Sequence, residues 1–231
     1  MVDLGAVQLK LAVGPFTIGA SGNPALKPSI VTNFELGYDR ALPALNAKIG
    51  ASVFVQKTED VKGQLSSTQL DIAPTATTLP IISYRNIGES EMTGVELAAS
   101  GTIEGGYHWS ADYTWTDVED QTLAGYSAVG RGTAFAETTP AYRGNVALGW
   151  ENDAWSADGY VRFVGGFAGY STTSTLVPID GYASLGGRVA RQFEQGFTVA
   201  VSGQNLIEEA QRQTAGLEAE RRVHLTVSKS W

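Results

Sequence analysis

Val223-His224-Leu225-Thr226-Val227-Ser228-Lys229-Ser230-Trp231 ends the chain with alternating apolar and polar side chains. Successive side chains of a β-strand point to opposite faces, so Val223, Leu225 and Val227 share one face of the predicted strand. Lys229 interrupts the apolar face close to Trp231, where its long stem would let the ammonium group reach a membrane interface. The stretch therefore predicts a strand with one apolar and one polar face.

The same two-residue alternation returns in eight more segments, and long helical patterns do not occur. The segments lie at residues 33–39, 48–56, 95–100, 109–116, 145–150, 158–163, 184–192 and 197–204. Residues 6–13 are a candidate for one further strand. We therefore expect an all-β, antiparallel fold of about nine to ten strands, with an N-terminal segment and loop at 1–28 and the strand domain at 29–231.

Composition excludes several classes of protein. The chain has no cysteine, two histidines and a net charge of -8, which argue against a disulfide framework, thiolate chemistry and a basic nucleic-acid surface. No apolar run reaches the ~18 residues of a membrane helix. The start, residues 1–13, lacks the pattern of a signal peptide. Mean hydropathy is near zero, as expected both for a soluble protein and for a barrel with alternating faces.

The predicted links alternate between short and long. Short links fall near 41–44, 101–106, 151–154 and 194–196, and long links near 59–82, 119–139, 171–179 and 206–220. Outer-membrane barrels have short periplasmic turns and longer extracellular loops. Aromatic side chains gather near the short links, as in a membrane-interface girdle: Tyr38, Tyr107, Trp109, Trp150, Trp155, Phe193, Phe197 and Trp231. A general preference of strands for aromatics does not explain that clustering.

Charged residues occupy the polar face of the predicted strands. They are Glu35, Asp39, Lys48, Glu96, Asp112, Asp158, Arg162, Arg188 and Arg222. A protein core would bury so many charges only at high cost. The polar face therefore lines a wet lumen, or else it faces solvent while the apolar face forms the core of a soluble two-sheet fold.

Several stretches, in order along residues 22–231, resemble the barrel of TonB-dependent receptors. The resemblance is carried by Asn23-Pro24-Ala25-Leu26-Lys27-Pro28 before Phe34-Glu35-Leu36-Gly37-Tyr38, by Asn86-Ile87-Gly88 before Gly94-Val95-Glu96-Leu97, by Thr139-Pro140, by Asn205-Leu206 and by the terminal aromatic Trp231. It implies an antiparallel transmembrane β-barrel in a Gram-negative outer membrane, of which this chain is the C-terminal part of a larger 22-stranded barrel.

The resemblance also implies a function and partners. Such receptors import scarce nutrients, and the resemblance implies for this chain a ligand such as a ferric siderophore. TonB drives such receptors through a plug domain. This chain has neither plug nor TonB box, so we expect a portion of a longer receptor that contacts outer-membrane lipid and the insertion machinery, for which Trp231 is the assembly signal. Two alternatives stay open: a stand-alone small outer-membrane barrel with a structural or adhesion role, and a soluble β-sandwich binding module.

No constellation in the sequence predicts catalysis, and we expect no enzyme, no cofactor and no metal site. The acidic run Asp117-Val118-Glu119-Asp120 has hard oxygen ligands, but its spacing is not that of a calcium loop. The long links carry four side chains that would suit an anionic, partly aromatic ferric chelate through charge and stacking: Tyr126, Arg131, Phe135 and Tyr170. Scarce histidine disfavours haem as the ligand.

Overall fold

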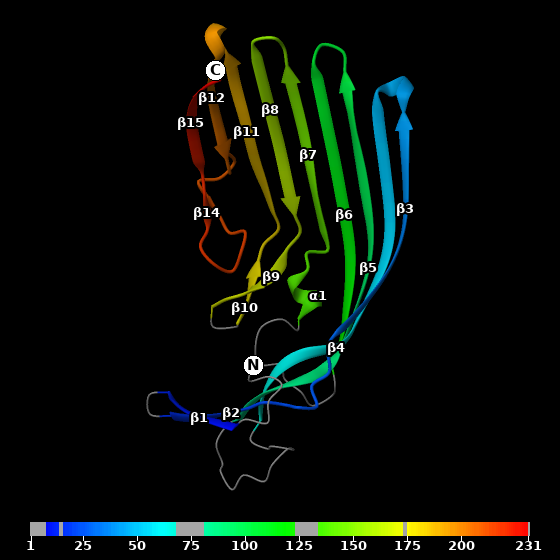
Figure 1. Ribbon diagram of the computed structural model, residues 1–231, viewed down its shortest axis with the longest axis vertical. Helices are drawn as coiled ribbons and strands as arrows, with labels where there is room; N and C mark the ends of the chain where they lie inside the picture. The colour runs from blue at the N-terminus through cyan, green and yellow to red at the C-terminus, as the bar shows by residue number, and fades with distance from the viewer. Residues whose placement is uncertain (1–7, 14–15, 68–80, 123–133, 173–174, 231) are drawn as a thin grey trace.

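The computed structural model describes residues 8–13, 16–67, 81–122, 134–172 and 175–230, and its main feature is one curved antiparallel wall (Figure 1). Each wall strand pairs with the next in chain order. All nine alternating segments lie on these strands, which confirms the predicted all-β antiparallel fold. The strands are β3 (Ile30–Leu42), β4 (Ala47–Ser67), β5 (Ile81–Ile103), β6 (Tyr107–Thr122), β7 (Tyr142–Glu151), β8 (Trp155–Val164), β11 (Tyr182–Gln192), β12 (Phe197–Gln204) and β15 (Arg222–Lys229).

Four tight connections join the wall strands at the upper end in Figure 1 and confirm the predicted short links. They are η1 (Pro43–Leu45), residues 104–106, residues 152–154 and η2 (Glu194–Gly196). Gly106 has a φ of +86°, and a Cβ at this position would collide with the carbonyl oxygen of Glu151. Only glycine fits both conditions, so Gly106 is required where the turn between β5 and β6 passes beside the end of β7.

The other end of the wall is longer than the alternation predicts. β4 continues to Ser67 and β5 begins at Ile81, so the predicted link near 59–82 is wrong in extent. β6 likewise continues to Thr122, inside the link predicted at 119–139. The extensions of β4 and β5 stay paired across a register shift near Val61. Hydrogen bonds between backbones need no apolar pattern. The strands can therefore extend beyond the segments in which apolar and polar residues alternate.

A short helix and hairpins lie at the longer end of the wall, opposite the tight turns. α1 (Phe135–Thr138) follows β6, and the last two long connections contain short hairpins. β1 (Gln8–Val13) and β2 (Phe16–Ser21) form a hairpin in which β2 pairs in parallel with the start of β5, away from β3. None of the helices in the described ranges is long and apolar enough to cross a membrane. The hairpins pair β9 (Phe167–Tyr170) with β10 (Leu176–Ile179), and β13 (Ala210–Gln211) with β14 (Ala219–Glu220).

The apolar face of the wall is exposed instead of packed. Leu36 is 75% exposed and Leu225 is 71% exposed, at the two edges of the sheet. A soluble β-sandwich would cover such side chains with a facing sheet, and a continuous exposed apolar face marks contact with membrane or partner. The soluble β-sandwich alternative is therefore wrong for the described part of the chain.

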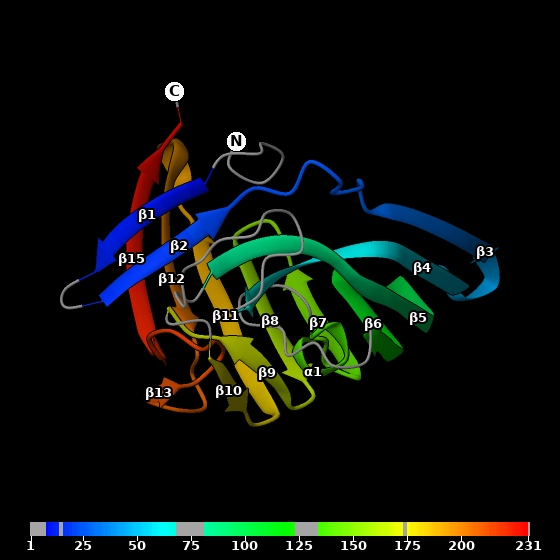
Figure 2. The same ribbon diagram turned by 90° about the horizontal axis from the view of Figure 1, so that it is seen from below.

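The wall is also open. Within the described residues β3 pairs only with β4, and β15 pairs only with β12, so the two edge strands do not meet (Figure 2). The described residues thus form no closed small barrel of their own. A small buried apolar cluster lies at the longer end, where Val61 and Ile87 are buried and Phe135 packs against them.

Candidate functional site

The inner face of the curved wall carries the predicted charges. The pairing register puts Asp39, Asp112 and Arg162 in one lateral row, opposite in side-chain direction to Leu36 and Leu225. The remaining charges of the predicted set fall on the same face by the two-residue alternation along each strand. This face, hereafter the lumen face, is the candidate functional surface.

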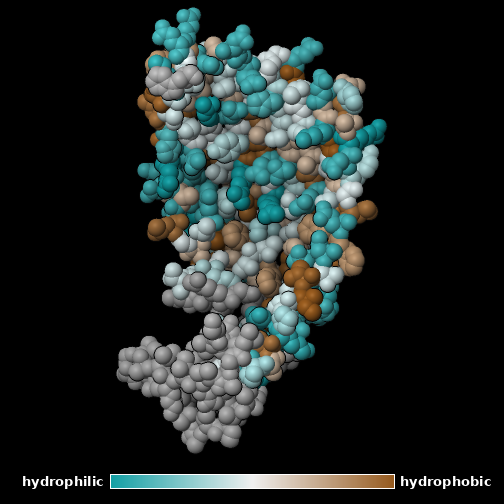
Figure 3. Space-filling view, in the orientation of Figure 1, coloured by the Kyte–Doolittle hydropathy of each residue, from teal (hydrophilic) through white to brown (hydrophobic). Residues whose placement is uncertain are grey.

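Charge is segregated across the lumen face, because the pairing of the strands gathers like charges that are scattered along the sequence. The acidic half belongs to β3, β5 and β6 and carries Glu35, Asp39, Glu96 and Asp112. The basic half belongs to β7, β8, β11 and β15 and carries Arg143, Arg162, Arg188 and Arg222. Hydrophilic side chains are spread over the wall in Figure 3. Lys48, Glu151 and Asp158 depart from this division. A solute in the lumen would still meet a field directed from one half to the other.

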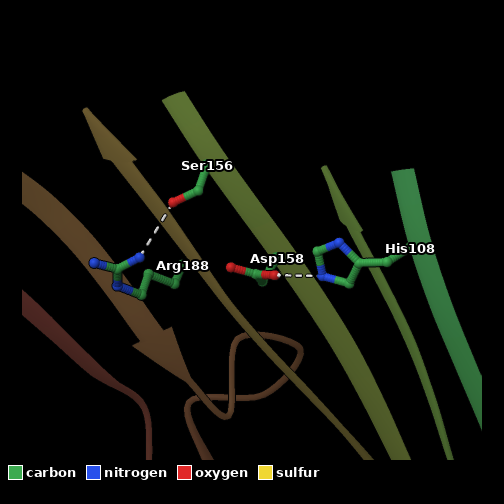
Figure 4. A network of polar contacts seen from close by, with 4 residues as sticks. All are labelled: His108, Ser156, Asp158 and Arg188. Carbon is green, nitrogen blue, oxygen red and sulfur yellow. Dashed lines mark hydrogen bonds and ion pairs between the residues drawn. The ribbon is translucent and has the colours of Figure 1, made fainter. Parts of the chain in front are cut away.

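A polar row near the short turns runs from β6 into the basic half (Figure 4). His108 Nε2 lies 3.2 Å from Asp158 Oδ1, although β7 separates their strands. Gly149 stands between them in the register, and a Cβ at this position would collide with the imidazole. Beside them, Arg188 Nη1 donates a hydrogen bond of 3.3 Å to Ser156 Oγ. The glycine therefore permits a side-chain contact that spans three strands.

The aromatic clustering predicted near the short turns is present in the described residues and includes cations. Tyr107 and Trp150 face each other across β6 and β7 with ring centroids 6.4 Å apart. The Arg191 guanidinium lies 5.2 Å from the Trp155 ring centroid. Lys229 Nζ lies 4.9 Å from the Phe197 ring centroid. A charged head above an aromatic ring suits the boundary between lipid and water, where Lys229 was expected.

Asparagine side chains hold the longer end together. Asn23 Nδ2 donates to the Tyr84 carbonyl at 3.1 Å, and Asn86 Nδ2 donates to the Asp60 carbonyl at 2.8 Å. Asn205, with a φ of +53°, donates to the Ala219 carbonyl at 2.6 Å. These asparagines come from the stretches that carry the family resemblance, so those motifs have a structural role in loop anchoring.

Two of the four residues predicted for ligand contact lie in the described structure. Phe135 is half-buried against Val61 and Ile87, and the Tyr170 hydroxyl accepts a hydrogen bond of 3.2 Å from the Ala134 amide. Both side chains therefore help to pack α1 against its neighbours. Their role in ligand contact stays a prediction. Tyr126, Arg131 and the predicted assembly signal Trp231 lie outside the described residues.

The acidic run after β6 also has a structural partner. Asp120 Oδ2 accepts a hydrogen bond of 2.9 Å from the Ala136 amide and so fixes the start of α1. Throughout the described ranges, no group of three or more histidine, aspartate or glutamate side chains is placed to hold a metal ion.

Comparison with known proteins identifies the relatives of this wall. Residues 5–206 match the family described as TonB dependent receptor-like, beta-barrel. A mutant of the ferric enterobactin receptor of Pseudomonas aeruginosa matches with a TM-score of 0.65 at 18% identity, over 98% of this chain and 35% of that one. The FrpB iron transporter of Neisseria meningitidis matches with a TM-score of 0.63 at 16% identity, over 92% of this chain and 32% of that one.

A third similar structure is the copper transporter OprC, with a TM-score of 0.63 at 15% identity over 89% of this chain and 32% of that one. No curated protein sequence matches the chain. Identities this low show the fold alone. The chain spans about a third of the length of the solved structures to which it is similar.

Proposed function

The chain belongs to the TonB-dependent receptor β-barrel family, and from that premise we propose that it forms part of a receptor that imports a scarce nutrient, a ferric siderophore, across the outer membrane. Members of this family are transport receptors of the Gram-negative outer membrane, not enzymes. In this proposal the described wall separates lipid from the path of the solute.

The observation that carries the proposal is the division of one sheet into two unlike faces. Leu36 and Leu225 are exposed on one face, whereas Asp39 and Arg162 lie on the other. A wall between lipid and a water-filled passage requires this arrangement. A binding module in water would gain nothing from the exposed apolar face.

The choice of a ferric siderophore is supported by chemistry and by the relatives. A receptor for ferric enterobactin and an iron transporter are among the similar structures. Arg131 and Tyr126, with Phe135 and Tyr170, are the proposed ligand contacts, because guanidinium and aromatic groups suit an anionic chelate. Energy would come from TonB, acting through a plug domain associated with the wall.

The direct experiment is uptake of radiolabelled ferric enterobactin by iron-starved cells, with and without the gene that encodes this chain. We expect uptake that requires the gene and stops when a protonophore collapses the proton-motive force. Radiolabelled copper serves as the second substrate, because a copper transporter has the same fold. Gene-dependent uptake of copper alone would reject the siderophore, and equal uptake of both metals with and without the gene would reject the transport function.

A further inference from the structure

A cleft of about 380 Å³ opens on the lumen face beside the last long loop. Tyr160, Arg162, Ser184, Gln204 and Arg222 line it from four wall strands, and residues of the loop 205–221 complete it. The wall residues of this lining lie on the basic half of the lumen face.

Register explains how the strands build the floor of the cleft. Tyr160 pairs with Gly186, and Gln204 pairs with Arg222. The pairing of β11 with β12 ends one residue before this row, at Gly187 and Gly203, so continuing that register by one residue brings the four positions into a single lateral row. The hydroxyl end of Tyr160 lies directly over Gly186, where any larger side chain would collide with the ring. Tyr160 thus leans across β11 toward Gln204 and brings a hydroxyl group to the row that contains Arg222.

Two guanidinium groups line the cleft without a counter-ion among the described residues. In the described part of the chain, no carboxylate lies within 4.0 Å of Arg162 or Arg222, whereas Arg212 in the adjacent loop pairs with Glu218 at 3.7 Å. Glu220 also lines the cleft. Its single carboxylate leaves a net positive charge, which the other arginines of the basic half reinforce.

The loop side of the cleft is fixed by hydrogen bonds before any solute binds. Gln211 Nε2 donates to the Ala183 carbonyl of β11 at 2.9 Å. Asn205 is only 4% exposed, and its Nδ2 donates a hydrogen bond of 2.6 Å to the Ala219 carbonyl. A cleft that is already ordered lowers the entropy cost of binding a solute.

We propose that this cleft binds an oxyanion, a carboxylate or phosphate group of a solute in the lumen, between the guanidinium groups of Arg162 and Arg222. Planar guanidinium groups donate paired hydrogen bonds that match the geometry of such anions. Tyr160, Ser184 and Gln204 supply neutral donors around the same space. The inference rests on the proposed uptake function and assigns its ligand an anionic group.

The experiment is calorimetric titration of citrate into the full chain folded in detergent, at constant ionic strength maintained with sodium chloride. Arg162→Gln and Arg222→Gln should each weaken citrate binding about tenfold or more, because each removes charge-assisted hydrogen bonds. Arg162→Lys should fall between wild type and Arg162→Gln. The matched control is Arg143→Gln, which removes the same charge from the same half of the lumen face but outside the cleft.

Equal weakening by Arg143→Gln and Arg162→Gln, with unchanged circular dichroism, would overturn the proposal, since the effect would then be general electrostatic attraction. Wild-type chain that binds no citrate would overturn it as well. The assay needs no transport. Arginine-dependent citrate binding together with failed uptake would reject only the uptake function, whereas successful uptake without a difference between the arginine variants would reject only the cleft.

Discussion

The carboxamide of Asn86 grips the backbone of Lys27 from both sides: its Oδ1 accepts a hydrogen bond of 2.9 Å from the Lys27 amide, and its Nδ2 donates one of 3.0 Å to the Lys27 carbonyl. The side chain thereby imitates the edge of a neighbouring strand. The two residues come from the two separate stretches of sequence that most resemble TonB-dependent receptors. The residues that carry the resemblance thus have a structural reason to occur together, because Asn86 of one stretch binds the backbone of the other.

Replacing Asn86 with alanine should release the segment around Lys27. The substitution removes both bonds to Lys27 and the bond to the Asp60 carbonyl, so the Lys27 amide should exchange its hydrogen at least about tenfold faster. Hydrogen exchange read by mass spectrometry measures this. Asn33→Ala, on strand β3, which follows the segment around Lys27, is the control. If residues 24–28 kept the wild-type protection from exchange in Asn86→Ala, the hydrogen bonds from Asn86 could not be what orders this segment.

Gly149→Ala should disrupt the contact between His108 and Asp158. The new methyl group would occupy the space of the imidazole, so overpacking should lower the free energy of unfolding by about 1–3 kcal/mol in urea titrations of the detergent-folded chain. Gly159→Ala is the matched control, because no atom lies within 4 Å of its Cβ position. Equal midpoints for the two variants would show that the histidine moves away without cost.

Gly94→Ala tests a second position where a glycine leaves room for the side chain of a neighbouring strand. The Phe54 ring of the neighbouring strand lies over Gly94, so the variant should unfold at lower urea concentration by about 1–3 kcal/mol in the free energy of unfolding. Removing the ring in a Phe54→Ala and Gly94→Ala double variant should make the loss less than additive. Gly37→Ala, whose Cβ position meets only ordinary contact at 3.9 Å, is the control. Strictly additive losses would contradict the packing argument.

Most of the wall could be predicted because its physics is local. Alternation with a period of two places Leu225 and Thr226 on opposite faces whatever the rest of the chain does. The turn at Gly106 is also encoded locally, because few residues other than glycine adopt a backbone with positive φ. The extensions of β4 and β5 to Ser67 and from Ile81 could not be predicted, because partner strands stabilise them and no apolar pattern does.

The candidate site was less predictable because it depends on register. His108 and Asp158 are 50 residues apart, and only the pairing of β6, β7 and β8 brings them together. The row of Tyr160 and Arg222 depends in the same way on three pairings. Phe135 and Tyr170, which were predicted from loop composition, help to pack α1, and their role in ligand contact stays a prediction.

The direction of Leu225 gives the sharpest test of the lipid-facing assignment. Leu225→Arg would place a charge on the exposed apolar face of β15 and should destabilise the membrane-inserted wall by roughly 2–4 kcal/mol, the cost of arginine near the bilayer midplane. Thr226→Arg adds the same side chain one residue later on the lumen face, where water solvates it, and should change stability by no more than about 0.5 kcal/mol. Urea unfolding from lipid vesicles compares the two variants directly. If Thr226→Arg proved the costlier change, the lumen and lipid faces would have to be exchanged, and the cleft at Arg162 would then face lipid.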